Sequence, residues 1–267
     1  MTTTVRDRWN DGLATIGVWL TIPSSECAET VARIGFDYCC MDLQHGVLDY
    51  QSSVAMIQAV TMVGGSPIAR VPWNEPGIVG KLLDAGAHGV VVPMVNSPAE
   101  AASVVRAVRY PPLGARSYGP VMAGMRESGY DRWSNDHVAV IPMIETREAV
   151  ASIDSILAVP GIDAIYVGPA DLSLSLGLRP QNNDGEALFD DALAAVIAAC
   201  NRAGVVAGIH ATPELTTRRL EQGFRMVTMT NEIIAMRVGL AGALAACRGP
   251  ATPGSAATGA RSSAAIY

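Results

Sequence analysis

Short apolar runs recur along the chain, and polar or amphipathic segments of about helix length separate them. The runs predict eight strands, at residues 15–21, 36–41, 67–71, 89–94, 138–144, 164–167, 205–209 and 226–229. Helix signals lie between them, such as the capping box Ser97-Pro-Ala-Glu100, which has proline at the first helical position. This alternation is typical of an α/β protein, here a closed (β/α)8 TIM barrel. An open doubly wound sheet is the alternative, and the lack of a Gly-x-Gly-x-x-Gly motif after the first strand disfavours it.

The length of 267 residues is usual for one barrel of this kind. Residues 1–12 are polar and predict an N-terminal arm, and residues 13–248 form the predicted barrel domain. Residues 111–129 are rich in Gly and Pro and predict a long connection before the fifth strand. Residues 249–267 are rich in Ala, Ser, Gly and Pro, which predicts a disordered tail.

Composition narrows the class of protein. Hydrophobic residues make up 49% and charged residues 16%, which indicates apolar surface buried between subunits of a homo-oligomer. The net charge of −6, without a basic cluster, argues against nucleic-acid binding. No apolar run is long enough to span a membrane, and the N-terminus lacks an apolar signal core. Five cysteines without metal-type spacing indicate reduced thiols in a cytoplasmic protein.

Chemically useful side chains gather at predicted strand ends: Asp42, His45, Arg70, Glu145 and Asp171. The C-terminal ends of barrel strands meet at one mouth, so we expect these groups to converge. Two carboxylates suit a hard divalent cation, which would bind the carboxylate and ketone of a 2-oxo acid and stabilise an enolate. Arg70 offers planar donors to the same oxygens, and Asp42 could orient His45 as a general base.

Ordinary structural roles compete with these assignments. Glu145 could lie in the first turn of a helix, where the dipole favours an acid, and Asp171 could be an N-cap. His45 alone is more often a surface or core histidine. Arg70 is harder to explain in this way, because a buried arginine in an apolar strand needs a partner. The joint placement of all of them at strand ends favours the functional interpretation.

The other ionisable candidates have weaker support. His210 ends the seventh predicted strand and could reach the mouth, so it is a second candidate. His88 and His137 precede strands, which places them at the far end of the barrel in structural roles. Asp84 lies in a predicted helix and, on this evidence alone, is a solvated charge.

Several segments, in this order over residues 13–240, resemble the HpcH/HpaI family of metal-dependent aldolases. They are Gly35-Phe-Asp-Tyr38, Met41-Asp-Leu-Gln-His-Gly46, Ala69-Arg-Val-Pro72, Gly86-Ala-His-Gly89, Tyr110-Pro-Pro112, Ile144-Glu145 and Val167-Gly-Pro-Ala-Asp-Leu172. The resemblance implies a carbon–carbon lyase that cleaves or forms 4-hydroxy-2-oxo acids from pyruvate, or a related 2-oxo acid, and an aldehyde. It also implies a homo-oligomer, a hexamer or trimer, whose C-terminal helices are exchanged between subunits.

The resemblance assigns a role to each matching residue. Glu145 and Asp171 become ligands of Mg2+ or Mn2+, with Co2+ or Zn2+ as further options. Arg70 becomes the enolate-stabilising residue, and His45, paired with Asp42, becomes the base. The resemblance also implies that the backbone at Gly168, Pro169 and Ala170 receives the substrate carboxylate, and that Asp84 reaches a neighbouring subunit's site.

The sequence departs from the family at three positions. Gln44 stands where members often have Glu, Met143 where many have Gln, and His210 where the residue is often apolar. Gln44 and His210 therefore become candidates for substrate contact that differ from the family pattern. Two alternatives stay open: a citrate-lyase-β-like enzyme that cleaves a CoA thioester, and a non-catalytic barrel that binds a metal and an oxo acid.

Overall fold

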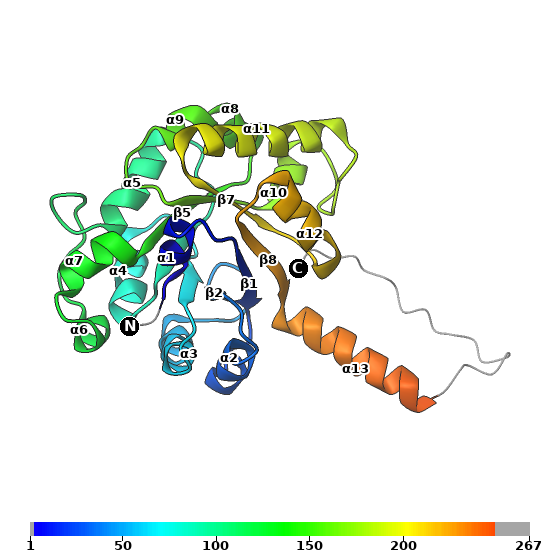
Figure 1. The fold of residues 1–267 in the computed structure, drawn as a ribbon, viewed down its shortest axis with the longest axis horizontal. Coiled ribbons are helices and arrows are strands. Elements are labelled where there is room, and N and C mark those ends of the chain that lie inside the picture. Colours follow the sequence, from blue (N-terminus) through cyan, green and yellow to red (C-terminus); the bar gives the residue numbers. More distant parts are fainter. Residues whose placement is uncertain (1–2, 249–267) are drawn as a thin grey trace.

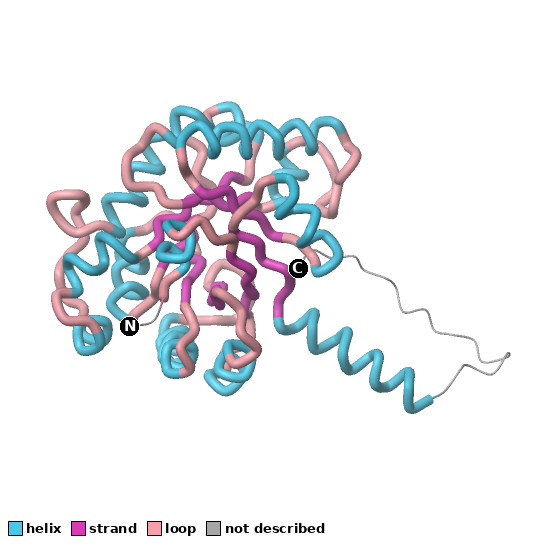
Figure 2. Tube along the Cα trace, in the orientation of Figure 1, coloured by secondary structure: helices cyan, strands magenta, loops and turns pink. Residues whose placement is uncertain are grey.

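The computed structural model describes residues 3–248, and the predicted tail at 249–267 lies outside them. Eight strands form a closed parallel barrel in sequence order (Figure 2). They are β1 (Thr15–Leu20), β2 (Tyr38–Asp42), β3 (Pro67–Arg70), β4 (Gly89–Val92), β5 (Ala139–Ile144), β6 (Ala164–Val167), β7 (Val206–His210) and β8 (Met226–Asn231). Pairing of β8 with β1 closes the sheet, which confirms the predicted (β/α)8 barrel and excludes the open doubly wound sheet.

Helices surround the barrel and connect its strands (Figure 1). They include α2 (Ser25–Ala32), α3 (Tyr50–Met62), α4 (Pro76–Ala85), α5 (Pro98–Val108), α11 (Ala187–Ala203) and α12 (Pro213–Gln222). The predicted capping box at Ser97 is present, because its side chain accepts from the backbone N–H of Glu100 and the Glu100 carboxylate accepts from the Ser97 backbone N–H. Side-chain caps also start α2 and α3, whereas α4 and α12 begin with proline in their first turn.

Some helices differ from the prediction. The Gly- and Pro-rich connection contains α6 (Val121–Arg126), and α7 (Tyr130–His137) follows it. Neither helix has a side-chain cap at its start, so the sequence carries no capping signal for them. Two short helices, α8 (Arg147–Ala151) and α9 (Ile153–Leu157), follow β5. A short helix, α10 (Pro169–Ser175), follows β6 directly.

The barrel interior is a packed apolar core rather than a channel. Trp19, Tyr38, Tyr166 and Met226 belong to a buried cluster contributed by several strands. Gly17 on β1 leaves room for the Tyr38 ring, because a Cβ at this position would lie 2.2 Å from that ring. A second, larger cluster lies between the strands and the surrounding helices. These two layers hold the strand ends in fixed positions relative to one another.

A short helix, α1 (Val5–Asn10), closes the N-terminal end of the barrel, within the predicted N-terminal arm. It lies across the centre of the barrel in Figure 1. Val5 is fully buried and packs with the interior cluster, and Trp9 Nε1 donates to Thr15 Oγ1 at 3.0 Å. Thr4 and Asp7 form a capping box that starts the helix.

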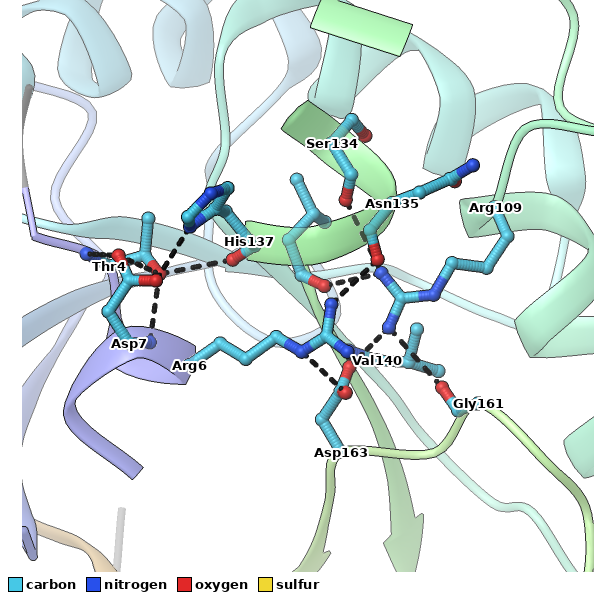
Figure 3. Close-up of polar contacts among 11 residues, drawn as sticks. Thr4, Arg6, Asp7, Arg109, Ser134, Asn135, His137, Val140, Gly161 and Asp163 are labelled. Atoms are coloured by element: carbon cyan, nitrogen blue, oxygen red, sulfur yellow. Dashed lines mark hydrogen bonds and ion pairs between the residues drawn. The ribbon is translucent and has the colours of Figure 1, made fainter. Parts of the chain in front are cut away.

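Ionic contacts hold α1 in place (Figure 3). Arg6 Nε lies 2.8 Å from Asp163 Oδ1, and Arg109 Nη2 donates to Asp163 Oδ2 at 2.5 Å. His137 Nδ1 lies 2.6 Å from Asp7 Oδ1. Desolvation raises the pKa of Asp163, and the two arginines oppose that shift. His137 therefore lies at the far end of the barrel, as predicted.

The last described helix, α13 (Glu232–Arg248), projects away from the barrel (Figure 1). Glu232 anchors its start, because its buried carboxylate accepts from the backbone N–H groups of Thr21 and Ile22. Beyond Glu232, large apolar side chains are exposed along the helix, including Val238 and Leu240. Across residues 3–248, no helix combines the length and the apolar character that crossing a membrane requires.

Candidate active site

Asp42 and Arg70 form a buried ion pair at the C-terminal ends of β2 and β3. Arg70 Nε donates to Asp42 Oδ1 at 2.8 Å and Nη2 donates to Asp42 Oδ2 at 2.5 Å. The relative exposure of both residues is 1% or less. Two parallel hydrogen bonds of this kind fix the guanidinium plane as well as its position. The register of the parallel pair β2–β3 places the two residues side by side, because Asp42 lies opposite Arg70.

The turn after β2 is organised by the same carboxylate. Asp42 Oδ1 accepts hydrogen bonds from the backbone N–H groups of Gln44 at 3.1 Å and His45 at 3.2 Å. His45 is exposed at this turn. Among the described residues, the Gln44 Oε1 atom is buried and accepts no hydrogen bond. Asp42 therefore ties the position of the predicted base to the position of Arg70.

Glu145 directly follows β5 and is almost fully buried. Its Oε2 accepts from the Met94 backbone N–H at 2.8 Å, and Met94 has a left-handed φ of 57°. A non-glycine residue with this φ is unusual, and such conformations concentrate at functional sites. Gly168 packs against the same carboxylate, because a Cβ added there would lie 2.4 Å from Glu145 Oε1. The backbone on both sides thus sets the direction of the Glu145 side chain.

The electrostatics around Glu145 favour a cation. Desolvation raises the pKa of Glu145 to about 7, and the negative charge of Asp171 adds to the shift, whereas the Met94 N–H and Arg70 oppose it. Asp171 lies in the first turn of α10, half-buried, so β5 and the β6–α10 connection bring the two acids together. Like charges in a poorly hydrated site repel, and a bound cation would offset that repulsion.

The donor set fits a hard cation that keeps water ligands. Within residues 3–248, no cluster of three or more His, Cys, Asp or Glu side chains is placed to hold a metal ion. Glu145 and Asp171 alone would provide two carboxylate ligands. Mg2+ is commonly bound through one or two carboxylates with several waters, whereas Zn2+ sites use three or four protein ligands. Mg2+ or Mn2+ therefore fits these residues better than Zn2+.

Aromatic and polar side chains lie in the barrel interior, next to the Arg70 side chain. The Arg70 guanidinium carbon lies 4.2 Å from the centroid of the Trp19 ring. Trp19 stacks on Tyr166 and meets the His210 ring edge-on at 5.4 Å. Tyr166 Oη lies 3.4 Å from His210 Nδ1 and donates to Thr228 Oγ1 at 2.6 Å. This arrangement connects His210, the second candidate, to Arg70 through a single indole ring.

His210 is neutral at physiological pH. Burial lowers its pKa to about 4, and the positive charge of Arg70 contributes in the same direction. The structure places His210 at the end of β7, beside the ring that also contacts Arg70. Trp19, Tyr166 and Thr228 were not predicted, because each belongs to an apolar strand segment and carries no signal that separates it from core.

Asp84 lies apart from the strand-end group within this chain. It is near the C-terminal end of α4, where Arg116 Nη2 donates to Asp84 Oδ1 at 2.6 Å. A helix that follows a barrel strand runs back toward the N-terminal end, so this position is distant from the mouth of the same barrel. His88 lies before β4, where its Nδ1 is 3.2 Å from Ser66 Oγ, in the structural role predicted for it.

Comparison with known proteins gives consistent relatives. The chain is 39% identical over 231 residues to a hydroxypyruvate/pyruvate aldolase of Rhizorhabdus wittichii. The aligned region covers 86% of this chain and 92% of that protein. It is 35% identical to a 2-dehydro-3,6-dideoxy-6-sulfogluconate aldolase of Pseudomonas putida, over 92% of this chain and 97% of that protein. The crystal structure of a family protein from Burkholderia cenocepacia superposes with a TM-score of 0.85 at 32% identity, covering 92% of this chain and 99% of that one.

A family model agrees with these relatives over most of the barrel. The HpcH/HpaI aldolase/citrate lyase model matches residues 15–236, from the first strand into the last described helix. That span contains the C-terminal ends of all eight strands. The chain belongs to the HpcH/HpaI aldolase/citrate lyase family.

Proposed function

We propose that this protein is a metal-dependent aldolase that cleaves or forms 4-hydroxy-2-oxo acids, with pyruvate or a related 2-oxo acid and an aldehyde as the other reactants. The observation that carries the proposal is the pair of carboxylates, Glu145 and Asp171, beside the buried Asp42–Arg70 pair in a chain of this family. The aldolase names of its relatives support the same reaction class. We place the reaction in the cytoplasm, because the described cysteines are free thiols.

Glu145 and Asp171 are the proposed metal ligands. A divalent cation such as Mg2+ or Mn2+ supplies Lewis-acid polarisation of the 2-oxo acid when it is bound there. The Met94 N–H and the Gly168 backbone hold the Glu145 carboxylate in one direction, so little reorganisation is needed on binding. The backbone of Gly168, Pro169 and Ala170, at the start of α10, is the proposed contact for the substrate carboxylate.

Arg70 and His45 carry the proposed proton and charge chemistry. In the cleavage direction, His45 accepts the proton of the C4 hydroxyl, and the C3–C4 bond breaks to release the aldehyde. Arg70 stabilises the negative charge that develops on the enolate oxygen, at a position fixed by Asp42. Gln44 follows Asp42 in the same turn, and His210 contacts the Trp19 ring that also contacts Arg70, so these two residues are the proposed contacts that distinguish one substrate from another.

We propose a homo-oligomer in which α13 packs on a neighbouring subunit. The helix exposes Val238, Leu240 and Leu244 in this chain, a surface that an aqueous monomer rarely leaves uncovered. Exchange of α13 between subunits, in a hexamer or trimer, covers these side chains. In the same assembly, Asp84 is the residue proposed to reach the neighbouring site.

The first test is pyruvate release from 4-hydroxy-2-oxo acids by EDTA-treated protein, with and without added Mg2+ or Mn2+. We expect release to depend on the metal and to fall by at least about a hundredfold in Arg70→Lys, which keeps a positive charge but loses the planar fork. Arg33→Lys is the matched control, because Arg33 pairs with Glu29 on the exposed face of α2. Release that persists without metal, or in Arg70→Lys at the wild-type rate, would reject this mechanism.

The same assay separates the alternatives. Cleavage of an acyl-CoA thioester with no pyruvate release would replace the aldolase by a citrate-lyase-β-like enzyme. Tight Mn2+ binding with no turnover on either substrate would indicate a binding protein.

A further inference from the structure

The aromatic ring of Trp19 packs against the face of the Arg70 guanidinium. The guanidinium carbon lies 4.2 Å from the centroid of that ring. Asp42 accepts two hydrogen bonds from the same guanidinium, at 2.8 and 2.5 Å, and these bonds act within its plane. The ring acts perpendicular to that plane, in a direction that the carboxylate does not cover. Trp19 and Asp42 therefore hold the guanidinium from two independent directions.

Water does not reach this contact, which makes it stronger. Arg70 is 0% exposed and Trp19 is 3% exposed. A guanidinium is attracted to the face of an aromatic ring, most of all to an indole, and the attraction increases when both groups are desolvated. Because water cannot take the place of the ring, loss of the ring removes a contact that the buried cation does not recover from solvent.

Trp19 is itself held in one orientation. It lies near the end of β1, in register with Cys40 of β2, which is two residues before Asp42. Its ring stacks on that of Tyr166, with a centroid distance of 5.5 Å and an interplanar angle of 27°. The His210 ring meets it edge-on at 5.4 Å. Contacts from β6 and β7 thus keep the indole in a fixed position against the guanidinium.

The indole N–H indicates that this tryptophan does more than fill the core. Nε1 of Trp19 is buried, and it has no hydrogen-bond partner among residues 3–248. A buried donor without a partner carries a free-energy penalty that phenylalanine or leucine at the same position would avoid. Trp9, at the opposite end of the barrel, differs because its Nε1 donates to Thr15 Oγ1 at 3.0 Å. An unsatisfied buried group is expected where a side chain serves function rather than stability.

We propose that Trp19 is a positioning residue for the aldol reaction, whose ring holds the Arg70 guanidinium, by a cation–π contact, where Arg70 stabilises the enolate oxygen. Trp19 acts through Arg70 and supplies no proton or charge of its own. A displacement of a catalytic group by about 1 Å is enough to lower a rate by about a hundredfold. The inference rests on the proposed aldolase function and gives a role to a side chain that the proposed mechanism does not otherwise use.

Pyruvate release from 4-hydroxy-2-oxopentanoate, with added Mn2+, tests the proposal. Trp19→Leu removes the ring, and we expect kcat to fall about tenfold or more while KM changes by less than about threefold, because the contact acts on the enolate. Trp19→Phe keeps an aromatic face and should recover most of the wild-type kcat. Trp9→Leu is the matched control, because it makes the same change at the opposite end of the barrel and should leave kcat unchanged.

A double-mutant cycle separates positioning from direct contact between Trp19 and the substrate. Arg70→Gln removes the cation but keeps a donor that can reach Asp42. Because the ring acts through Arg70, Trp19→Leu should lower kcat by less than about twofold in the Arg70→Gln background. Losses that add fully in the double variant would overturn the proposal, since Trp19 would then act independently of Arg70.

Fluorinated tryptophan at position 19 provides a second kind of variant, which keeps the test open if Trp19→Leu does not fold. Fluorine weakens the attraction of the ring for a cation and changes its shape very little. We expect kcat to fall as fluorine atoms are added, and a kcat that does not depend on their number would contradict a cation–π contact. Circular dichroism confirms that each variant is folded before its rate is interpreted.

A crystal structure of the Trp19→Leu variant gives a measurement that needs no turnover. We expect the Arg70 guanidinium to leave the position that it has in the wild-type protein, while Asp42 stays at the end of β2. An unmoved guanidinium, or a wild-type kcat in Trp19→Leu, would overturn the proposal. If the wild-type protein releases no pyruvate with any metal, the proposed aldolase function fails, and the variant structure still decides whether Trp19 positions Arg70.

Discussion

Replacing Gly168 by Ala tests whether close backbone packing positions the proposed metal ligand. The backbone of Gly168 has φ −94° and ψ 97°, which any residue can adopt, so alanine brings no conformational strain. The only conflict is steric, because the new Cβ would lie 2.4 Å from Glu145 Oε1 and 3.0 Å from its Cγ. The substitution therefore acts on one carboxylate and adds only a single methyl group.

The magnitude follows from the contact distance. Non-bonded heavy atoms reach their optimal separation at about 3.5 Å, so the Glu145 carboxylate has to move by roughly 1 Å. Metal–ligand distances tolerate only about 0.2 Å, and disturbing the groups that orient a ligand costs about 10–100-fold in metal affinity. We expect Gly168→Ala to weaken metal binding by that factor, equivalent to about 1–3 kcal/mol.

The measurement is a titration of EDTA-treated protein with Mn2+, in which free Mn2+ is followed by electron paramagnetic resonance. Gly124→Ala on α6 is the control, because its Cβ would meet Pro120 Cγ at an ordinary 3.5 Å. Wild-type Mn2+ affinity in Gly168→Ala, with the control also unchanged, would refute the idea that Gly168 fixes the direction of Glu145.

Three further predictions concern stability, each followed by urea denaturation. Asp42→Ala leaves the buried Arg70 without its carboxylate and should lower the free energy of unfolding by roughly 3–5 kcal/mol; a loss below about 1 kcal/mol would contradict this. Burial lowers the pKa of His88 from 6.5 to about 4. Between these two pH values the unfolded state binds more protons than the folded state, so the free energy of unfolding falls by about 2 kcal/mol from pH 7 to pH 5. His88→Gln should remove that share of the pH dependence, and an unchanged slope would exclude it. Arg6→Met should cost about 1–2 kcal/mol without altering KM, since it loosens α1 only.

The barrel itself could be predicted from the sequence, because strand and helix periodicities are local properties. The candidate residues at the strand ends could also be predicted, since an acid or arginine at the end of an apolar run is easy to recognise in the sequence. Asp42, Arg70 and Glu145 are therefore recognisable as candidates from the sequence alone, and β2 and β3 bring the first two together.

Features that depend on distant contacts could not be predicted in this way. The left-handed φ of Met94 belongs to a residue type that gives no sign of it, and its backbone N–H donates to the Glu145 carboxylate, which is 51 residues away in the sequence. Helix α1 is six residues long and polar, and partners more than a hundred residues away hold it. Trp19 looks like core in the sequence, whereas in the structure it connects His210 with Arg70.

The closed N-terminal end separates two kinds of evolutionary change in this fold. Helix α1 seals that end with Val5 and its ionic contacts, while the acids and arginine lie at the opposite end. Substitutions around α1 can raise or lower the melting temperature without altering the groups that meet a substrate. Substitutions in the loops at the mouth can then change which aldehyde is accepted, while substitutions at the other end adjust the thermal stability of the barrel independently. Directed evolution of this protein can use the two ends as separate libraries, one for durability and one for selectivity.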